Sequence, residues 1–259
     1  MRDDRRPMKN WILRAPLLLM LFFLLMSSRA SSPKPSSLEE PVSTPFILQL
    51  ISDPEVKEVQ EAAFMIKAKH HRRVSAGTGM AVERDRILTA FHLVGDPYTG
   101  EITAEEIWVS QPHTDWKGEI SAEVVRADPS VDVAVLKVKP FREVPPLSFG
   151  DPDQLRPGEL IYLIGHEVFL LDGIGILYPR DGEIMGDFTS EESTFLVISP
   201  PVARGFSGGG VFNQKHELVG IISRNSLFPK TVKEGGRVYR MVKQGAIATK
   251  IHCALPLLE

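Results

Sequence analysis

Residues 77–94, GTGMAVERDRILTAFHLV, contain two short β-type runs separated by turn residues. The runs GTGMAVE (77–83) and RILTA (86–90) have the length and the apolar content of short strands. His92 follows the second run, where the chain leaves the strand for a loop or a single helical turn. The stretch therefore predicts neighbouring strands with an imidazole presented beyond the second one.

Runs of the same kind recur on both sides of this stretch. The first set comprises AFMIKAK (63–69), the two runs above, EIWVS (106–110), EISAEVVRA (119–127) and DVAVLKV (132–138). The second set comprises ELIYLIG (159–165), GIGILYP (173–179), TFLVISP (194–200), GVFNQ (210–214), ELVGIIS (217–223) and VYRMV (238–242). Because no helix separates successive strands, the pattern favours an all-β fold over a doubly wound α/β sheet.

The two sets predict two antiparallel barrels, at about 62–140 and about 146–248. The stretch 139–147 would connect them, and residues 249–258 would form a short closing helix. Before the first barrel, Asp53 followed by Pro54 predicts a helix that starts there and runs to about Glu61, with Asp53 as its N-cap.

Composition narrows the possible classes of protein. The chain has 259 residues, of which 43% are hydrophobic, enough for a sizeable core. The formal charge is −3, and Lys and Arg do not gather into one long stripe, so we expect no nucleic-acid partner. Cys253 is the only cysteine, which excludes an intramolecular disulfide.

The first 30 residues form a separate segment. Arginines and lysines precede an apolar run from Ala15 to Met26, and Ser28 and Ala30 then have the spacing that a signal peptidase reads. The run has 12 residues, fewer than the roughly 20 that cross a bilayer as a helix. We expect export with a cleaved signal, and a retained N-terminal membrane anchor is the alternative. Residues 31–45 are rich in Ser and Pro and predict a linker to a folded domain at 46–259.

The segment from Gly205 to Gly210, GFSGGG, carries the strongest chemical signal. A serine flanked by glycines can sit on a tight turn that exposes backbone N–H groups, and such groups can bind an oxyanion. On its own the segment is also compatible with a glycine-rich hairpin turn.

A nucleophilic serine needs a base and a third group that orients the base. His92 lies after an apolar strand, and Asp132 lies at the mouth of another, where a buried carboxylate needs a partner. Either residue alone could be a strand-end or turn residue. Together with Ser207 they occur in the order His, Asp, Ser, which predicts a catalytic triad.

With these motifs assembled, the sequence resembles the trypsin-like serine peptidases, and the bacterial HtrA-type branch in particular. The likeness is carried by GTGMAVERDRILTAFHLV (77–94), DVAVLKV (132–138) and ARGFSGGGVFNQKHELVGI (203–221). It extends to RPGELIYLIGHEVFLLDGIGILYP (156–179) and QGAIATKI (244–251), and so covers about 62–258. Because only 52 residues follow Ser207, we expect no PDZ domain of the kind that HtrA-type proteases often append.

The resemblance implies a serine endopeptidase that acts on polypeptides without a metal or cofactor. His92 would be the general base, Asp132 its orienting carboxylate and Ser207 the nucleophile, and the N–H groups of Gly205 and Ser207 would form the oxyanion hole. Pro201 and Ser223 would belong to the substrate pocket. Pro201 stands where enzymes that cleave after Lys or Arg carry an acid, so we expect an uncharged, small or aliphatic residue before the cleaved bond.

Phe206 and Phe91 depart from the family pattern, which has Asp or Asn at the first position and a small residue at the second. The departure at Phe206 leaves open a catalytically inactive barrel that binds peptides. GFSGG also matches the nucleophile elbow of α/β-hydrolases, but no Asp follows Ser207 and the next segment predicts a hairpin instead of a helix. The histidines form no His-Glu-x-x-His zinc motif.

Overall fold

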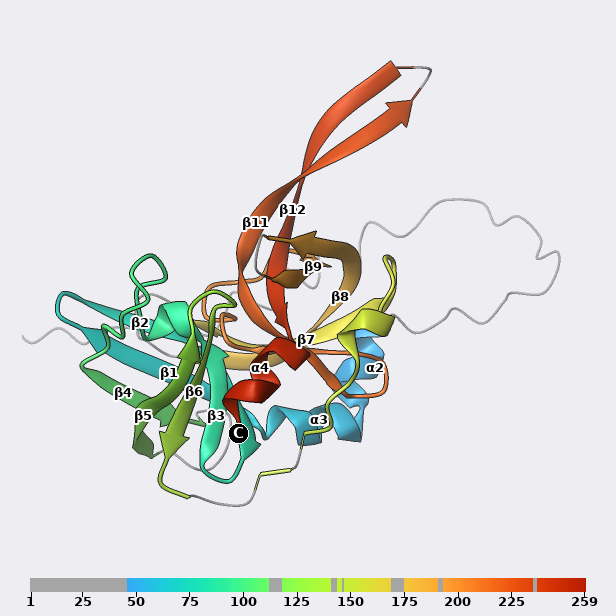
Figure 1. Ribbon diagram of the computed structural model, residues 1–259. Coiled ribbons are helices and arrows are strands. Elements are labelled where there is room, and N and C mark those ends of the chain that lie inside the picture. Colours follow the sequence, from blue (N-terminus) through green and yellow to red (C-terminus); the bar gives the residue numbers. More distant parts are fainter. Residues whose placement is uncertain are drawn as a thin grey trace, which may run out of the picture. The chain divides into compact units, whose positions relative to one another are not determined.

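A computed structural model of the chain describes residues 46–111, 118–140, 144–145, 147–168, 175–190, 193–234 and 237–259. It contains two closed antiparallel barrels of six strands each (Figure 1). The predicted all-β class, the two barrels and the short C-terminal helix are confirmed. The predicted signal segment and the linker lie outside the described residues.

The first barrel is closed in the strand order β1-β2-β3-β6-β5-β4. Its strands are β1 (Ala63–His70), β2 (Arg73–Glu83), β3 (Arg86–Ala90), β4 (Glu106–Ser110), β5 (Glu119–Asp128) and β6 (Val133–Val138). Each strand contains or closely matches one of the short β-type runs identified in the sequence. The interior is filled by apolar side chains such as Phe64, Ile66, Ile87 and Leu136, all fully buried.

The second barrel is closed in the order β10-β11-β12-β9-β8-β7. Its strands are β7 (Leu160–Val168), β8 (Gly175–Thr189), β9 (Thr194–Ser199), β10 (Gly210–Phe212), β11 (Leu218–Glu234) and β12 (Arg237–Lys250). Residues 173–174 of the predicted strand 173–179 lie outside the described part.

Three strands of the second barrel are much longer than the sequence pattern indicates. β11 has 17 residues and β12 has 14, and their register continues from Gly220↔Lys250 to Glu234↔Arg237. The outer part of this pair extends away from the barrel as a two-stranded arm (Figure 1). β8 likewise continues to Thr189. These lengths are set by hydrogen bonding between neighbouring strands. Short apolar runs in the sequence do not report such pairing.

Within the described residues, two helices precede the first barrel, α2 (Phe46–Ser52) and α3 (Pro54–Gln60). The Asp53 side chain accepts a hydrogen bond from the Glu55 backbone N–H at 2.9 Å, so the predicted N-cap of α3 is confirmed. Helix α2 was not predicted. At the C-terminus, α4 (Ile251–Ala254) and a 3-10 turn at 255–257 form the closing helix.

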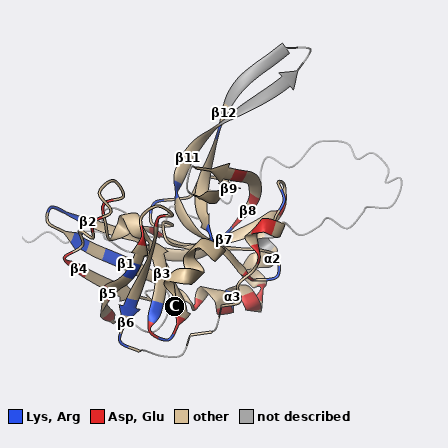
Figure 2. Cartoon of the chain, in the orientation of Figure 1, with Lys and Arg blue, Asp and Glu red and all other residues tan. Residues whose placement is uncertain are grey.

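One apolar cluster joins the barrels and the N-terminal helices. It combines Met80 and Val135 of the first barrel with Tyr162 and Ile247 of the second, and Val56 of α3 packs into it. Lys, Arg, Asp and Glu occur on both barrels (Figure 2). None of the described helices has the length and hydropathy of a membrane-spanning segment.

Candidate active site

His92 and Asp132 meet at the end of the first barrel that faces the second. His92 lies in the 3-10 helix η1 (Phe91–Leu93), which directly follows β3, and Asp132 directly precedes β6. The His92 Nδ1 lies 2.9 Å from Asp132 Oδ2, and the His92 backbone N–H donates to Oδ1 at 2.9 Å. Because a carboxylate only accepts, Nδ1 carries the proton and Nε2 is left as an acceptor.

Asp132 is 5% exposed and adopts a left-handed backbone conformation, with φ of 56°. Burial by itself would raise the pKa of its carboxyl group, but hydrogen bonds from His92 and Ser223 outweigh burial and hold the pKa below its ordinary value. Asp132 is therefore ionised at neutral pH. Asp is one of the few residues besides Gly that adopt this conformation readily.

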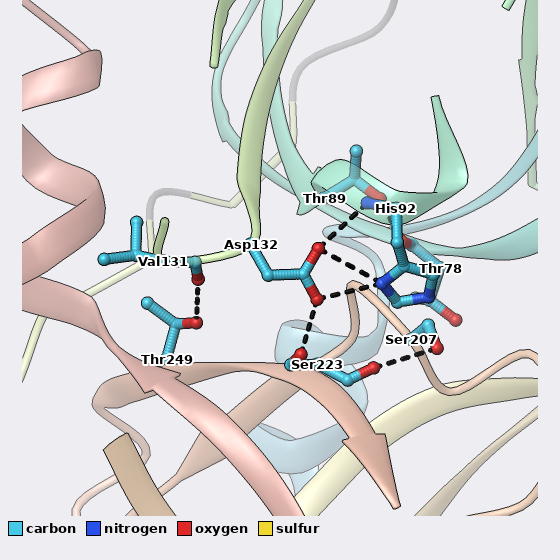
Figure 3. Close-up of polar contacts among 8 residues, drawn as sticks. All are labelled: Thr78, Thr89, His92, Val131, Asp132, Ser207, Ser223 and Thr249. Atoms are coloured by element: carbon cyan, nitrogen blue, oxygen red, sulfur yellow. Dashed lines mark hydrogen bonds and ion pairs between the residues drawn. The ribbon is translucent and has the colours of Figure 1, made fainter. Parts of the chain in front are cut away.

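Ser207 lies on the turn that leads into β10, at the edge of the second barrel. Its Oγ donates to the backbone carbonyl of Ser223 at 3.1 Å, and the Ser223 hydroxyl donates to Asp132 Oδ2. Figure 3 shows the His92 ring between Asp132 and Ser207. Among the described hydrogen bonds, none joins Ser207 Oγ to His92 Nε2. The hydroxyl instead donates to the Ser223 carbonyl.

The backbone of the serine turn leaves two N–H groups available. The carbonyls of Arg204 and Phe206 accept from the N–H groups of Val168 and Gly209, at 2.9 and 2.8 Å. In a trans peptide the next N–H points the opposite way, so the N–H groups of Gly205 and Ser207 point away from these partners. No described hydrogen bond uses either of them. Gly205 has φ of 95°, and a Cβ there would come within 2.5 Å of the His166 carbonyl oxygen.

Thr78 of β2 holds the serine turn against the first barrel. Its backbone N–H donates to the Ser207 carbonyl at 2.8 Å, and its hydroxyl donates to the Gly205 carbonyl at 2.7 Å. The same hydroxyl accepts from the His166 backbone N–H at 2.8 Å. One residue of the first barrel thus positions the carbonyls on both sides of Phe206, one through its backbone N–H and the other through its hydroxyl.

The two residues that depart from the family pattern, Phe206 and Phe91, each pack their ring against a glycine. The Phe206 ring is fully buried inside the second barrel, where a Cβ on Gly165 would come within 2.6 Å of it. The Phe91 ring is also fully buried, and a Cβ on Gly95 would come within 2.2 Å of it. Apolar packing in the barrel interior therefore anchors the serine turn.

The two residues expected in a substrate pocket occupy different places. Ser223 is fully buried, and its hydroxyl bonds to Asp132. Pro201 lies in the segment before the serine turn, beside Val202, whose backbone N–H and carbonyl both bond to the Asn225 side chain at 2.8 Å.

Sequence reasoning missed the contacts of Thr78 and Asn225. The glycines on either side of Thr78 were an available signal, since a Cβ on Gly77 would come within 2.8 Å of the Ser207 carbonyl oxygen.

Several known proteins are similar to this chain in sequence. Residues 77–221 match the family model described as a trypsin-like peptidase domain. A protein of Brucella suis named "Probable periplasmic serine endoprotease DegP-like" is 32% identical over 160 residues, which is 59% of this chain and 28% of that protein. A Pseudomonas putida protein of the same name is 32% identical over 154 residues, 58% of this chain and 29% of its own length. The chain thus spans less than a third of the length of these relatives.

Solved structures show the same fold. The Rv3671c protease of M. tuberculosis in its active form has a TM-score of 0.60 and 21% identity, and the alignment covers 86% of this chain and 93% of that one. The HtrA-type protease AlgW with a tripeptide has a TM-score of 0.59 and 19% identity, over 79% of this chain and 61% of that one. The family model covers more than half of the 259 residues. This chain therefore belongs to the family of trypsin-like peptidase domains.

Proposed function

We propose that this protein is an exported serine endopeptidase in which His92, Asp132 and Ser207 act as a catalytic triad. One observation carries the proposal: an ionised, buried Asp132 fixes the Nδ1–H tautomer of His92, whose ring lies between Asp132 and Ser207. That tautomer leaves Nε2 as the atom that accepts a proton.

The first chemical step starts with rotation of the Ser207 hydroxyl from the Ser223 carbonyl toward His92 Nε2. Hydroxyl groups rotate freely, and such contacts tighten when substrate binds. Ser207 Oγ then attacks the peptide carbonyl while Nε2 takes its proton. The N–H groups of Gly205 and Ser207 would stabilise the oxyanion, since neither is used by another described acceptor.

The second half of the reaction returns the proton. His92 gives it to the leaving amine, which departs and leaves an acyl group on Ser207. Water then attacks the ester with His92 again as the base, and Ser207 is released with the second product. Asp132 stays ionised throughout and stabilises the imidazolium ion that forms at each step.

Labelling with a fluorophosphonate, together with digestion of an unfolded test protein, tests this function. An activated serine reacts covalently with the reagent, whereas a barrel that only binds peptides would bind the test protein without labelling or cleavage. Mass spectrometry of the fragments would then map the cleaved bonds.

We further propose that the side chain before the cleaved bond is small or aliphatic. Pro201, in the segment before the serine turn, supplies no carboxylate for a cationic side chain, and the Asn225 side chain bonds the neighbouring Val202 backbone at 2.8 Å. Fragment ends should therefore carry mainly Ala, Val or similar residues, and Asn225→Gly should raise kcat/KM for larger aliphatic residues by on the order of tenfold. Fragments ending mainly in Lys or Arg would contradict this.

We also propose that residues 1–30 are an export signal and residues 31–45 a linker to the peptidase domain at 46–259. The basic, apolar and small-residue order of the segment supports this, as do the relatives named periplasmic. Intact-mass analysis of the exported protein should give a chain beginning near Ser31. A chain that keeps Met1 and sediments with membranes would instead indicate a membrane anchor.

A further inference from the structure

A cavity of about 560 Å³ opens beside the catalytic candidates, and the proposed reaction does not use most of its wall. His92 and Asp132 border it on one side. The rest of its wall includes the aromatic residues Tyr98, Phe188 and Phe195 and the cation Arg224. Phe188 and Phe195 face each other across β8 and β9, with ring centroids 6.3 Å apart. The cavity therefore combines an aromatic wall with two charged groups, Asp132 and Arg224.

Arg224 is exposed, and no described hydrogen bond or ion pair involves its side chain. The one carboxylate in the described wall of the cavity is Asp132, which is 5% exposed and bonds to His92 and Ser223. A guanidinium group is always charged at physiological pH and presents donors in a fork that matches a carboxylate. Arg224 therefore favours binding of a negatively charged group of a ligand that enters the cavity.

The β-bulge at Ser223 explains how Arg224 reaches this position. The register of β11 against β12 runs Ile222↔Ala248 and then Arg224↔Ile247, so Ser223 is the extra residue. A bulge re-aims the side chains beside it. Here the Ser223 hydroxyl points to Asp132 and the next side chain, Arg224, reaches the cavity.

The edge of β11 gives the direction of a bound peptide. On the side opposite β12, β11 pairs with β10 only as far as Ile221, and among the described residues no strand covers that edge from Arg224 onward. An extended peptide can add to a free edge of this kind. If it pairs antiparallel, as every strand of both barrels does, it runs toward Ser207. The residues that pass Arg224 then precede the cleaved bond.

We propose that this cavity selects an acidic side chain in the part of the substrate that precedes the cleaved bond, with Arg224 as its cation. The proposal rests on the proposed peptidase function and adds the class of substrate. Alternate residues of an extended peptide face the same side, so the second or fourth residue before the bond faces the cavity when the first faces Asn225. Tyr98, Phe188 and Phe195 cover the methylene groups of the acidic side chain.

Matched peptides that differ only in Glu or Gln at successive positions before the bond test this selection. The protein should cleave the Glu peptide with a kcat/KM about fivefold higher at the second or fourth position, the upper end expected of a charge pair near the surface. Because such a contact is screened, the preference should shrink when salt rises from about 0.05 to about 0.5 M.

Variants of Arg224 test whether this residue causes the preference for Glu. Arg224→Gln should bring the Glu to Gln ratio close to one, and Arg224→Glu should reverse it so that a Lys peptide is preferred. Arg156→Gln is the matched control, since it removes an exposed arginine outside the cavity wall and should retain the wild-type ratio. Thermal melting of each variant checks folding.

Binding of the same peptides to Ser207→Ala protein, measured by calorimetry, supplies a readout that needs no turnover. A preference for Glu there that disappears when Arg224→Gln is added supports the cavity even if the proposed catalysis fails. Equal binding and equal cleavage of Glu and Gln peptides at every position would overturn the proposal while leaving the peptidase function intact.

Discussion

Ser207→Ala is expected to lower kcat for peptide hydrolysis by a factor of about 10⁴ to 10⁶. The change removes the atom that attacks the carbonyl. The residual rate would come from substrate binding and from the backbone N–H groups at positions 205 and 207, which the substitution leaves in place. Progress curves with a peptide identified from the digestion experiment, and loss of fluorophosphonate labelling, measure the effect.

The fold should survive this substitution. The Ser207 side chain makes one described hydrogen bond, to the Ser223 carbonyl, whereas the turn is held by the backbone contacts of Thr78 and by the buried Phe206 ring. Circular dichroism and the melting temperature should therefore match the wild type. Ser121→Ala, which removes an exposed hydroxyl on β5, is the matched control and should keep full activity.

The roles of Ser207 and His92 are coupled, so their losses should not add. His92→Ala alone should also cost a factor of about 10⁴ to 10⁶, and the double variant little more than either single change. A folded Ser207→Ala protein that still digests the test protein at close to the wild-type rate would remove Ser207 from the mechanism. Losses that multiply would instead mean that the two residues act independently.

Asp132→Asn is expected to lower kcat by a factor on the order of 10⁴. An Asn side chain can present an N–H group to His92 Nδ1, which favours the tautomer with the proton on Nε2. His92 then has no lone pair for the Ser207 proton. The substitution tests chemistry more than folding, because Asn has nearly the same size and also tolerates the left-handed conformation at φ of 56°.

The matched control for this change is Asp151→Asn. Asp151 is exposed, and its side chain accepts from the Asp153 backbone N–H at 3.0 Å, a contact that an Asn side chain can retain. The control should keep wild-type turnover and stability. Turnover of Asp132→Asn within a few-fold of the wild type would show that the ionised carboxylate is not needed to orient His92.

The positions of most strands and the identity of the candidate catalytic residues could be predicted from sequence, because both depend on local sequence patterns. β3 and β4 match the predicted runs RILTA and EIWVS residue for residue. Short apolar runs bounded by turn residues mark strands wherever one face is buried. The order His92, Asp132, Ser207 was likewise visible, since each lies next to such a run or within a glycine-rich turn.

The tertiary structure alone decided how these groups are held and what surrounds them. Ser223 bonds to Asp132 across 91 residues of sequence, and Thr78 to Gly205 across 127. Arg224 reaches the cavity beside His92 through a bulge that no local pattern marks. Contacts of this kind arise when each barrel closes and the two pack together, so they depend on register and on residues distant in sequence. Hydrophobic periodicity, which reports only the near neighbours of each residue along the chain, carries no information about them.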